Sequence, residues 1–171
     1  MAKRLFIIRH AQAEDFGFTS MLKDFDRDLT GKGLTQTARL GKFISEEKTK
    51  IACYISSPAN RALQTAKVFL EQDGLEEGEI IREQSLYDGG PKAYLACLNE
   101  ISEDFASVAI FGHNPDITFF AEYLTRDDVG GSMKKATLIE LMFSDLKWAE
   151  ISGNSGEFVR RINVKELTPE L

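Results

Sequence analysis

The sequence predicts an α/β fold: a three-layer α/β/α sandwich with a mostly parallel central sheet and a late antiparallel strand pair. Short apolar runs rich in β-branched and aromatic residues recur along the chain, as expected for strands that are covered on both faces. Segments with apolar residues at helical spacing separate these runs, an alternation typical of a parallel sheet between helical layers. Near the C-terminal end two strand-like segments follow each other directly, which indicates an antiparallel pair.

The first half of the chain contains two predicted strands and two predicted helices. Leu5–Ile8 is the first continuous apolar run, and apolar residues recur at helical spacing over 31–48. The second strand is expected at 51–55. Ser57 can cap the helix expected at 58–70, whose first residue is a proline, a residue well suited to that position.

The second half continues the alternation and closes with the strand pair. The predicted elements are a short edge strand at 79–82, a helix at 91–101, a strand at 108–111, a helix at 114–124, and two strands at 137–143 and 148–151 joined by a turn at 144–145. The sequence shows no internal repeat and no linker. We therefore expect residues 1–171 to form a single domain.

Composition limits the class of protein. Of the 171 residues, 43% are hydrophobic and 28% are charged, and the net charge is −6. An acidic chain without long runs of Lys or Arg is a poor candidate for binding nucleic acid. The sequence lacks a signal-peptide core and an apolar stretch near the ~20 residues of a membrane helix. Cys53 and Cys97 have no metal-binding spacing, so we expect free thiols and a cytoplasmic protein. The sequence leaves the oligomeric state open.

The only two histidines of the chain have similar surroundings. His10 and His113 each follow a predicted strand, and in open α/β sheets ligands bind at the carboxyl edge of the strands. Arg9 directly precedes His10, and Arg61 lies in the first turn of the helix after the second strand. The helix at 114–124 would also direct free N–H groups towards this edge. These groups predict a positively charged pocket for a phosphoryl group.

The chemistry of such a pocket needs these residue types. A neutral imidazole is a nucleophile near pH 7 and can carry a phosphoryl group covalently. Fixed positive donors stabilise the charge on the transferred group, and a carboxylic acid is the natural proton donor to the leaving group. Two histidines without a carboxylate cluster make a poor metal site, so we expect neither a metal nor another cofactor.

Four short motifs resemble those of the histidine phosphatase superfamily, also called phosphoglycerate mutase-like. In order they are Arg9-His10-Ala11, where the family has Arg-His-Gly; Leu29-Thr30 with Gly33 and Gln36; Ser57-Pro58 with Arg61 and Thr65; and Gly112-His113-Asn114-Pro115. They cover residues 5 to about 125. The short length and the last motif resemble the SixA-like branch, which includes phosphohistidine protein phosphatases.

The resemblance implies a role for each of five residues. His10 would be the nucleophile, and Arg9, Arg61 and His113 would hold the phosphoryl group. Asp88 would be the general acid, because Leu86-Tyr87-Asp88 resembles a Leu-x-Glu element of acid-bearing relatives; the alternative is a turn-forming aspartate before two glycines. The substrate would be a phosphorylated protein, with phosphohistidine as the implied group, or a small phosphorylated molecule.

Other functions stay open at this stage. The chain could be a small-molecule phosphoester phosphatase, a mutase, or a non-catalytic phosphate-binding module of the same fold. Phe16, Phe18, Met21 and Phe25 fall in the loop after His10, where they could anchor the loop or form an apolar rim for the substrate. Lys134-Lys135 could be an ordinary surface pair or could contact an acidic partner protein.

Overall fold

A computed structural model describes residues 2–15 and 24–167 of the chain. Its strands are β1 (Ala2–Arg9), β2 (Cys53–Ser56), β3 (Ile80–Arg82), β4 (Ser107–Gly112), β5 (Thr137–Ser144) and β6 (Glu157–Asn163). Its α-helices are α1 (Gly31–Glu46), α2 (Asn60–Gln72), α3 (Ser85–Asp88), α4 (Pro91–Asn99) and α5 (Asp116–Leu124). The short 3₁₀ helices are η2 (Asp24–Asp26), η3 (Glu77–Glu79), η4 (Trp148–Glu150) and η5 (Val164–Glu166).

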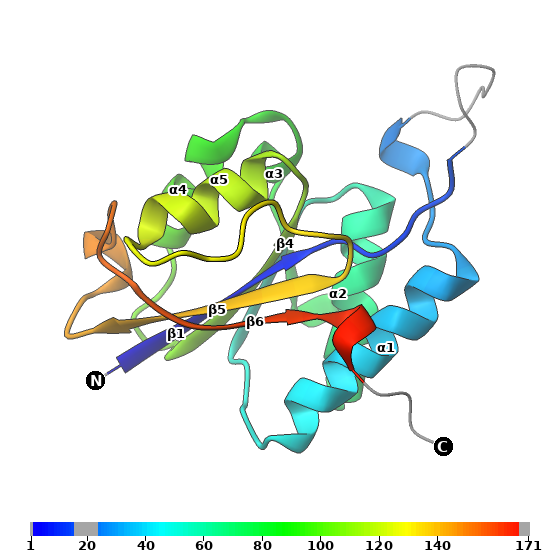
Figure 1. The fold of residues 1–171 in the computed structure, drawn as a ribbon, viewed down its shortest axis with the longest axis horizontal. Coiled ribbons are helices and arrows are strands. Elements are labelled where there is room, and N and C mark those ends of the chain that lie inside the picture. Colours follow the sequence, from blue (N-terminus) through cyan, green and yellow to red (C-terminus); the bar gives the residue numbers. More distant parts are fainter. Residues whose placement is uncertain (1, 16–23, 168–171) are drawn as a thin grey trace.

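The strands of the described residues form one sheet in the order β3-β2-β4-β1-β5-β6. The pairs from β3 to β1 are parallel, and β5 and β6 are antiparallel to their neighbours. Helices α4 and α5 cover one face, and α1 and α2 cover the other (Figure 1). The predicted α/β/α sandwich with a mostly parallel sheet is therefore confirmed.

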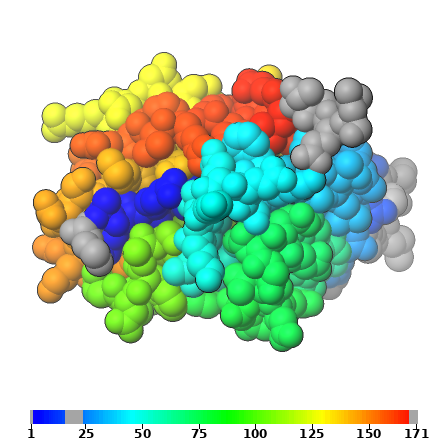
Figure 2. Space-filling model, turned by 90° about the horizontal axis from the view of Figure 1, so that it is seen from below, coloured from blue at the N-terminus to red at the C-terminus, as the bar shows by residue number. Residues whose placement is uncertain are grey.

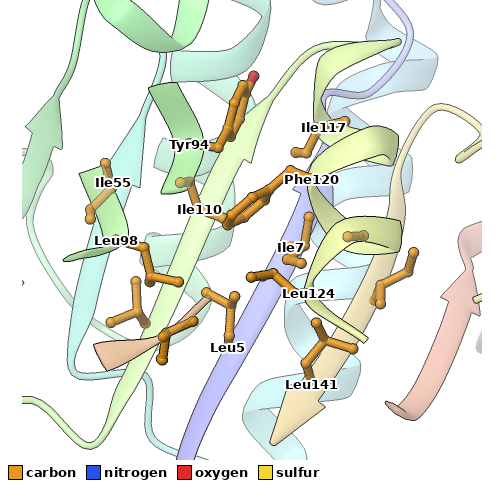
Figure 3. Packing of buried hydrophobic residues seen from close by; sticks show 14 of the residues in the cluster. Leu5, Ile7, Ile55, Tyr94, Leu98, Ile110, Ile117, Phe120, Leu124 and Leu141 are labelled. Carbon is orange, nitrogen blue, oxygen red and sulfur yellow. The ribbon is translucent and has the colours of Figure 1, made fainter. Parts of the chain in front are cut away.

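Two hydrophobic cores lie on opposite faces of the sheet, and β1 contributes to both because side chains alternate along a strand. Leu5 and Ile7 pack under α4 and α5, whereas Phe6 and Ile8 pack under α1 and α2. Figure 3 shows the first of these cores between the strands and α5, and Figure 2 shows α1 and α2 covering the second. All four side chains are fully buried, so the apolar run of β1 fixes it at the centre of the molecule.

The predicted strand at 148–151 is wrong. This segment contains η4, and the strand that pairs with β5 is β6. Trp148 is fully buried, and its indole N–H donates to the Phe105 carbonyl. The amide of Asn99 donates to the carbonyls of Trp148 and Ile151, which would otherwise be free to join a ladder. Packing of one large side chain therefore determines the backbone of this segment.

The predicted start of α2 is also wrong by two residues. The helix begins at Asn60 after Ala59, and no side chain caps it. Ser57 does not cap the helix, because its hydroxyl lies 2.8 Å from Nε2 of His113 and accepts from the N–H of Ala59 at 3.3 Å. The residue expected to cap the helix therefore belongs to the group of side chains around His113.

Helix α1 begins very close to the loop that follows β1. The hydroxyl of Thr30 caps the helix at the N–H of Gly33 and donates to the side-chain oxygen of Gln12 at 2.9 Å. A Cβ atom on Gly33 would lie 2.2 Å from the carbonyl oxygen of Gln12. Glycine is therefore required at 33 for the helix to approach the segment that carries His10.

We expect Gly33→Ala to destabilise the protein by about 1–3 kcal/mol, because the backbone of Gln12 cannot give way cheaply. Gly31→Ala is the matched control, since no atom lies within 4 Å of a Cβ at that position. Alanine there should leave stability unchanged or raise it by up to about 1 kcal/mol. Urea unfolding of both variants measures the difference. Equal midpoints for the two would contradict the steric account.

Candidate active site

The two histidines lie at the same edge of the sheet. His10 follows β1 and His113 follows β4, and these strands are parallel neighbours in which Arg9 pairs with Gly112. Both imidazoles are buried, and their ring centroids are 5.3 Å apart. Residues more than 100 positions apart in the sequence therefore meet at the carboxyl edge, as the strand pattern predicted.

The hydrogen bonds of His10 determine which ring nitrogen is free. Its Nδ1 lies 2.7 Å from the carbonyl oxygen of Ala11. A carbonyl can only accept, so Nδ1 carries the hydrogen and the lone pair is on Nε2. Burial lowers the pKa of His10 to about 3; the bond to Ala11 opposes the shift, and the positive charges of His113, Arg61 and Arg9 add to it. At pH 7 the ring is neutral, with a nucleophilic nitrogen at Nε2.

His113 is held from its main chain and from its side chain. Its backbone N–H donates to the hydroxyl of Tyr94 at 3.1 Å, and that hydroxyl donates to the carbonyl of Leu86. Figure 3 shows the ring of Tyr94 beside Ile110 and Phe120, with its hydroxyl at the far end of the core. Burial lowers the pKa of His113 to about 4, and the charge of Arg61 contributes to the shift.

Two arginines complete the group. Arg61 is buried on α2, and its guanidinium donates to the backbone carbonyl and to the carboxylate of Asp24, at 2.8 and 2.9 Å. Arg9 donates to the carbonyl of Met133 at 2.9 Å. Burial lowers the pKa of Arg9, and the positive charge of Arg61 lowers it further.

Three buried nitrogens of this group have no hydrogen-bond partner among the described residues. They are Nε of Arg9, Nε of Arg61 and Nδ1 of His113. Buried polar atoms in folded proteins are nearly always paired, so such a cluster calls for an explanation. An anion with several oxygens fits these nitrogens, because it accepts hydrogen bonds and compensates the positive charge. The charge and the unpaired nitrogens of this group therefore suit a phosphoryl group.

Asp24 and Tyr87 also belong to the site, and sequence analysis missed both. The hydroxyl of Tyr87 donates to Oδ2 of Asp24 at 2.9 Å, and the Tyr87 ring meets that of His113 edge-to-face at 5.7 Å. Partial burial alone would raise the pKa of Asp24. The hydrogen bond from Tyr87 and the charge of Arg61 outweigh that effect and hold the pKa below its usual value. Asp24 is thus an ionised carboxylate beside Arg61.

No signal near Asp24 in the sequence marks it as a site residue. It is one of three acidic residues in the segment 24–28, and only the fold selects it by placing η2 against Arg61.

The sequence model of the "Histidine phosphatase superfamily (branch 1)" matches residues 5–88, which include His10 and Arg61. Residues 5–88 of the chain therefore resemble the histidine phosphatase superfamily. A curated relative, the 2,3-bisphosphoglycerate-dependent phosphoglycerate mutase of Bartonella tribocorum, is 33% identical over 87 residues. The match covers 50% of this chain and 42% of the mutase, so the chain matches less than half of that relative's length.

Solved structures similar to this protein cover nearly all of it. A protein histidine phosphatase SixA complexed with tungstate has a TM-score of 0.80 at 20% identity, over 96% of this chain and 99% of SixA. A Nakamurella multipartita protein provisionally assigned as the phosphohistidine phosphatase SixA has a TM-score of 0.78 at 24% identity, over 95% and 96% of the chains. A mycobacterial glucosyl-3-phosphoglycerate phosphatase has a TM-score of 0.65 at 18% identity, over 92% and 97%. At these identities the likeness concerns the fold.

The structure does not bring Asp88 to the histidines and arginines. Asp88 is exposed at the end of α3, and its carboxylate accepts from the side chain of Gln84 at 3.1 Å. Its neighbour Tyr87 instead contacts Asp24 and the ring of His113. A one-residue change of direction on a short helix accounts for the difference, because successive helical side chains point about 100° apart.

Three residues of the aromatic loop considered above, Phe16, Phe18 and Met21, lie outside the described residues. Phe25 is described, and its ring packs edge-to-face on that of Tyr87 at 5.1 Å. Within residues 2–15 and 24–167, no group of three or more His, Cys, Asp or Glu side chains could hold a metal ion. In the same part of the chain, no helix is long and apolar enough to cross a membrane.

Proposed function

We propose that this protein is a phosphatase that uses His10 as its nucleophile and has protein phosphohistidine as its preferred substrate. The observation that carries the proposal is the bond from Nδ1 of His10 to the carbonyl of Ala11, which leaves a neutral Nε2 free. Buried Arg61 and half-buried Arg9 act on the ring of His10 through their charges, and the ring of His113 lies 5.3 Å from it. Residues 1–171 would form one catalytic domain.

The reaction would proceed in two steps. The lone pair on Nε2 of His10 attacks phosphorus, an N–P bond forms, and the bond from phosphorus to the leaving group breaks with its electron pair going to that group. Arg9, Arg61 and His113 stabilise the charge on the transferred oxygens. Water then attacks the phosphorylated His10, which releases inorganic phosphate and restores the neutral imidazole.

The state of the nearby acidic groups favours phosphohistidine over an alkyl phosphate. An alkoxide leaving group needs a proton, and general acid catalysis contributes about 10²–10⁴-fold. Asp24 is ionised beside Arg61, and Asp88 is exposed away from the group. Phosphohistidine protonated on its other ring nitrogen leaves as neutral imidazole and needs no donor from the enzyme. The fold similarity to SixA supports the same substrate class.

A substrate panel tests the proposal. We expect kcat/KM for a phosphohistidine peptide to exceed that for the matching phosphoserine peptide by at least about 10²-fold, because only the ester requires a proton donor. Para-nitrophenyl phosphate, with a good leaving group, should fall between them. The non-enzymatic hydrolysis of each substrate is the control. Equal rates for the two peptides would contradict the proposed substrate class.

A phosphoester phosphatase or mutase is the second candidate, favoured by the match to a phosphoglycerate mutase over half of the chain. Faster turnover of small phosphoesters than of phosphohistidine would favour the phosphatase, and phosphoryl transfer to a second hydroxyl would favour the mutase. Phosphate binding without turnover of any substrate would indicate a binding module that has kept the fold.

A further inference from the structure

A basic hollow lies beside the candidate active site and shares Arg9 with it. Its volume is about 490 Å³, within the usual range of small-ligand sites. Its charged lining consists of Arg9, Lys32, Lys134, Lys135, Lys165 and a single carboxylate, Glu166. Five cations against one anion stand out in a chain whose net charge is −6. The hollow therefore concentrates positive charge in an otherwise acidic protein.

The lysines of this hollow lack carboxylate partners among residues 2–15 and 24–167. Within the part of the chain that the structure describes, none of the four forms an ion pair with a carboxylate. Glu166 accepts a hydrogen bond from the side chain of Asn163 at 2.9 Å. Like charges so placed repel one another unless an anion joins them.

The segment that carries Lys134 and Lys135 is fastened to both strands of the site. The carbonyl of Met133 accepts from Arg9 at 2.9 Å and from the side chain of Asn114 at 2.8 Å. The N–H of Ala136 donates to the carbonyl of His10 at 3.1 Å, and Ala136 adopts a φ of 56°. A left-handed alanine costs energy and persists only where its surroundings hold it. The two lysines thus project from a backbone that is fixed relative to His10.

Further lining residues come from the start of α1 and from η5. Lys32 lies in the first turn of α1, a turn without acidic residues, so its charge adds to the positive end of the helix dipole. Lys165 lies in η5, which Figures 1 and 2 show beside α1 near the C-terminal end of the described chain. Segments from four parts of the sequence therefore contribute cations to one hollow.

We propose that this hollow is an anion subsite that binds a second anionic group, a carboxylate or a phosphate, of the molecule whose phosphoryl group meets His10. Arg9 lines the hollow and its charge acts on His10, so one guanidinium is shared by the hollow and the candidate active site. The inference deepens the proposed function, on which it rests. Substrates with acidic groups near the scissile bond are bound more tightly than substrates that lack them.

Two matched pairs of substrates test the subsite and separate the two sources of the anion. The first pair is a phosphohistidine peptide with flanking aspartates and the same peptide with flanking asparagines. The second pair is a bisphosphate and a monophosphate of one sugar. The wild-type protein should prefer the more acidic member of at least one pair by about 10-fold in kcat/KM, and added salt should reduce the preference.

The double variant Lys134→Ala/Lys135→Ala should reduce that preference to within about 2-fold. Lys92→Ala is the control, because Lys92 is an exposed lysine of α4 that does not line the hollow. Equal kcat/KM within both pairs for the wild type, or a preference that the double variant retains, would overturn the proposal.

Equilibrium binding measurements test the anion subsite independently of the proposed catalytic function. Calorimetry should show tripolyphosphate binding more tightly than orthophosphate, with the difference lost in the double variant and retained in Lys92→Ala. If no substrate is hydrolysed but this pattern holds, the proposed function fails and the subsite stands. If the substrates are hydrolysed but tripolyphosphate binds the wild type and the double variant equally, the subsite fails and the proposed function stands.

Discussion

Replacing His10 with alanine is expected to reduce turnover of the phosphohistidine peptide by at least about 10⁴-fold, because the reaction loses the atom that forms the covalent bond. The wild-type protein should also become labelled when it is mixed briefly with substrate that carries a radioactive phosphoryl group and is quenched in base. Phosphohistidine survives base and is lost in acid, whereas a phosphoserine ester behaves in the opposite way. The label should therefore be absent from His10→Ala and labile to acid in the wild type.

Two controls separate chemistry from folding in this experiment. The thermal unfolding midpoint of His10→Ala should stay near that of the wild type, because the neutral ring is held mainly by one bond to Ala11. Binding of tungstate should also persist, since Arg9, Arg61 and His113 remain. Undiminished turnover by a folded His10→Ala protein would refute the assignment of the nucleophile.

Replacing Arg61 with alanine is expected to lower kcat for the phosphohistidine peptide by about 10²–10³-fold, the usual cost of removing one donor that stabilises a transition state. The side chain is buried and is held by two hydrogen bonds to Asp24, so it is already oriented before substrate arrives. Arg61→Lys should recover only part of the loss, because an ammonium group cannot reproduce the planar fork of a guanidinium.

A double-mutant cycle distinguishes the role of Arg61 in catalysis from its role as a partner of Asp24. If Arg61 acts on the phosphoryl group, Asp24→Asn should change kcat far less than Arg61→Ala, and the double variant should resemble Arg61→Ala alone. If Asp24→Asn restores activity to the Arg61→Ala protein, the loss came from an unpaired carboxylate and the proposed role is wrong.

Sequence patterns predicted the centre of this fold better than its margins. The buried strands β1 and β4 are continuous apolar runs that a parallel sheet requires, and they place His10 and His113 side by side. The edge of the sheet was harder to predict, because β6 is an edge strand rich in charged residues. Arg160 of β6 donates to Glu140 of β5, which is buried, and to Glu47 at the end of α1. A charged residue in a sequence suggests a solvent-exposed position, so the sequence does not reveal charges that pair across the sheet.

The residues of the candidate active site also divide into those that the sequence predicted and those that it did not. Arg9 and His10 are adjacent in the chain, and the motifs around Arg61 and His113 are short and local, so they could be recognised one by one. Asp24 and Tyr87 could not, because their roles depend on a meeting of η2 and α3 across 63 positions of sequence. The exposed position of Asp88 depends on the direction of one turn of helix, which no short motif encodes.

The contact between Gly112 and Tyr94 restricts which amino acids can replace either residue during evolution. A Cβ at 112 would lie 2.1 Å from the Tyr94 hydroxyl oxygen and 2.6–2.7 Å from two ring carbons. Removing the hydroxyl alone would therefore leave no room for alanine, and removing the ring would deprive the His113 N–H of its acceptor. Substituting Gly112 alone would therefore create a steric clash, and substituting Tyr94 alone would remove a hydrogen bond. Any redesign of α4 must therefore keep Tyr94 or supply another acceptor for the His113 N–H.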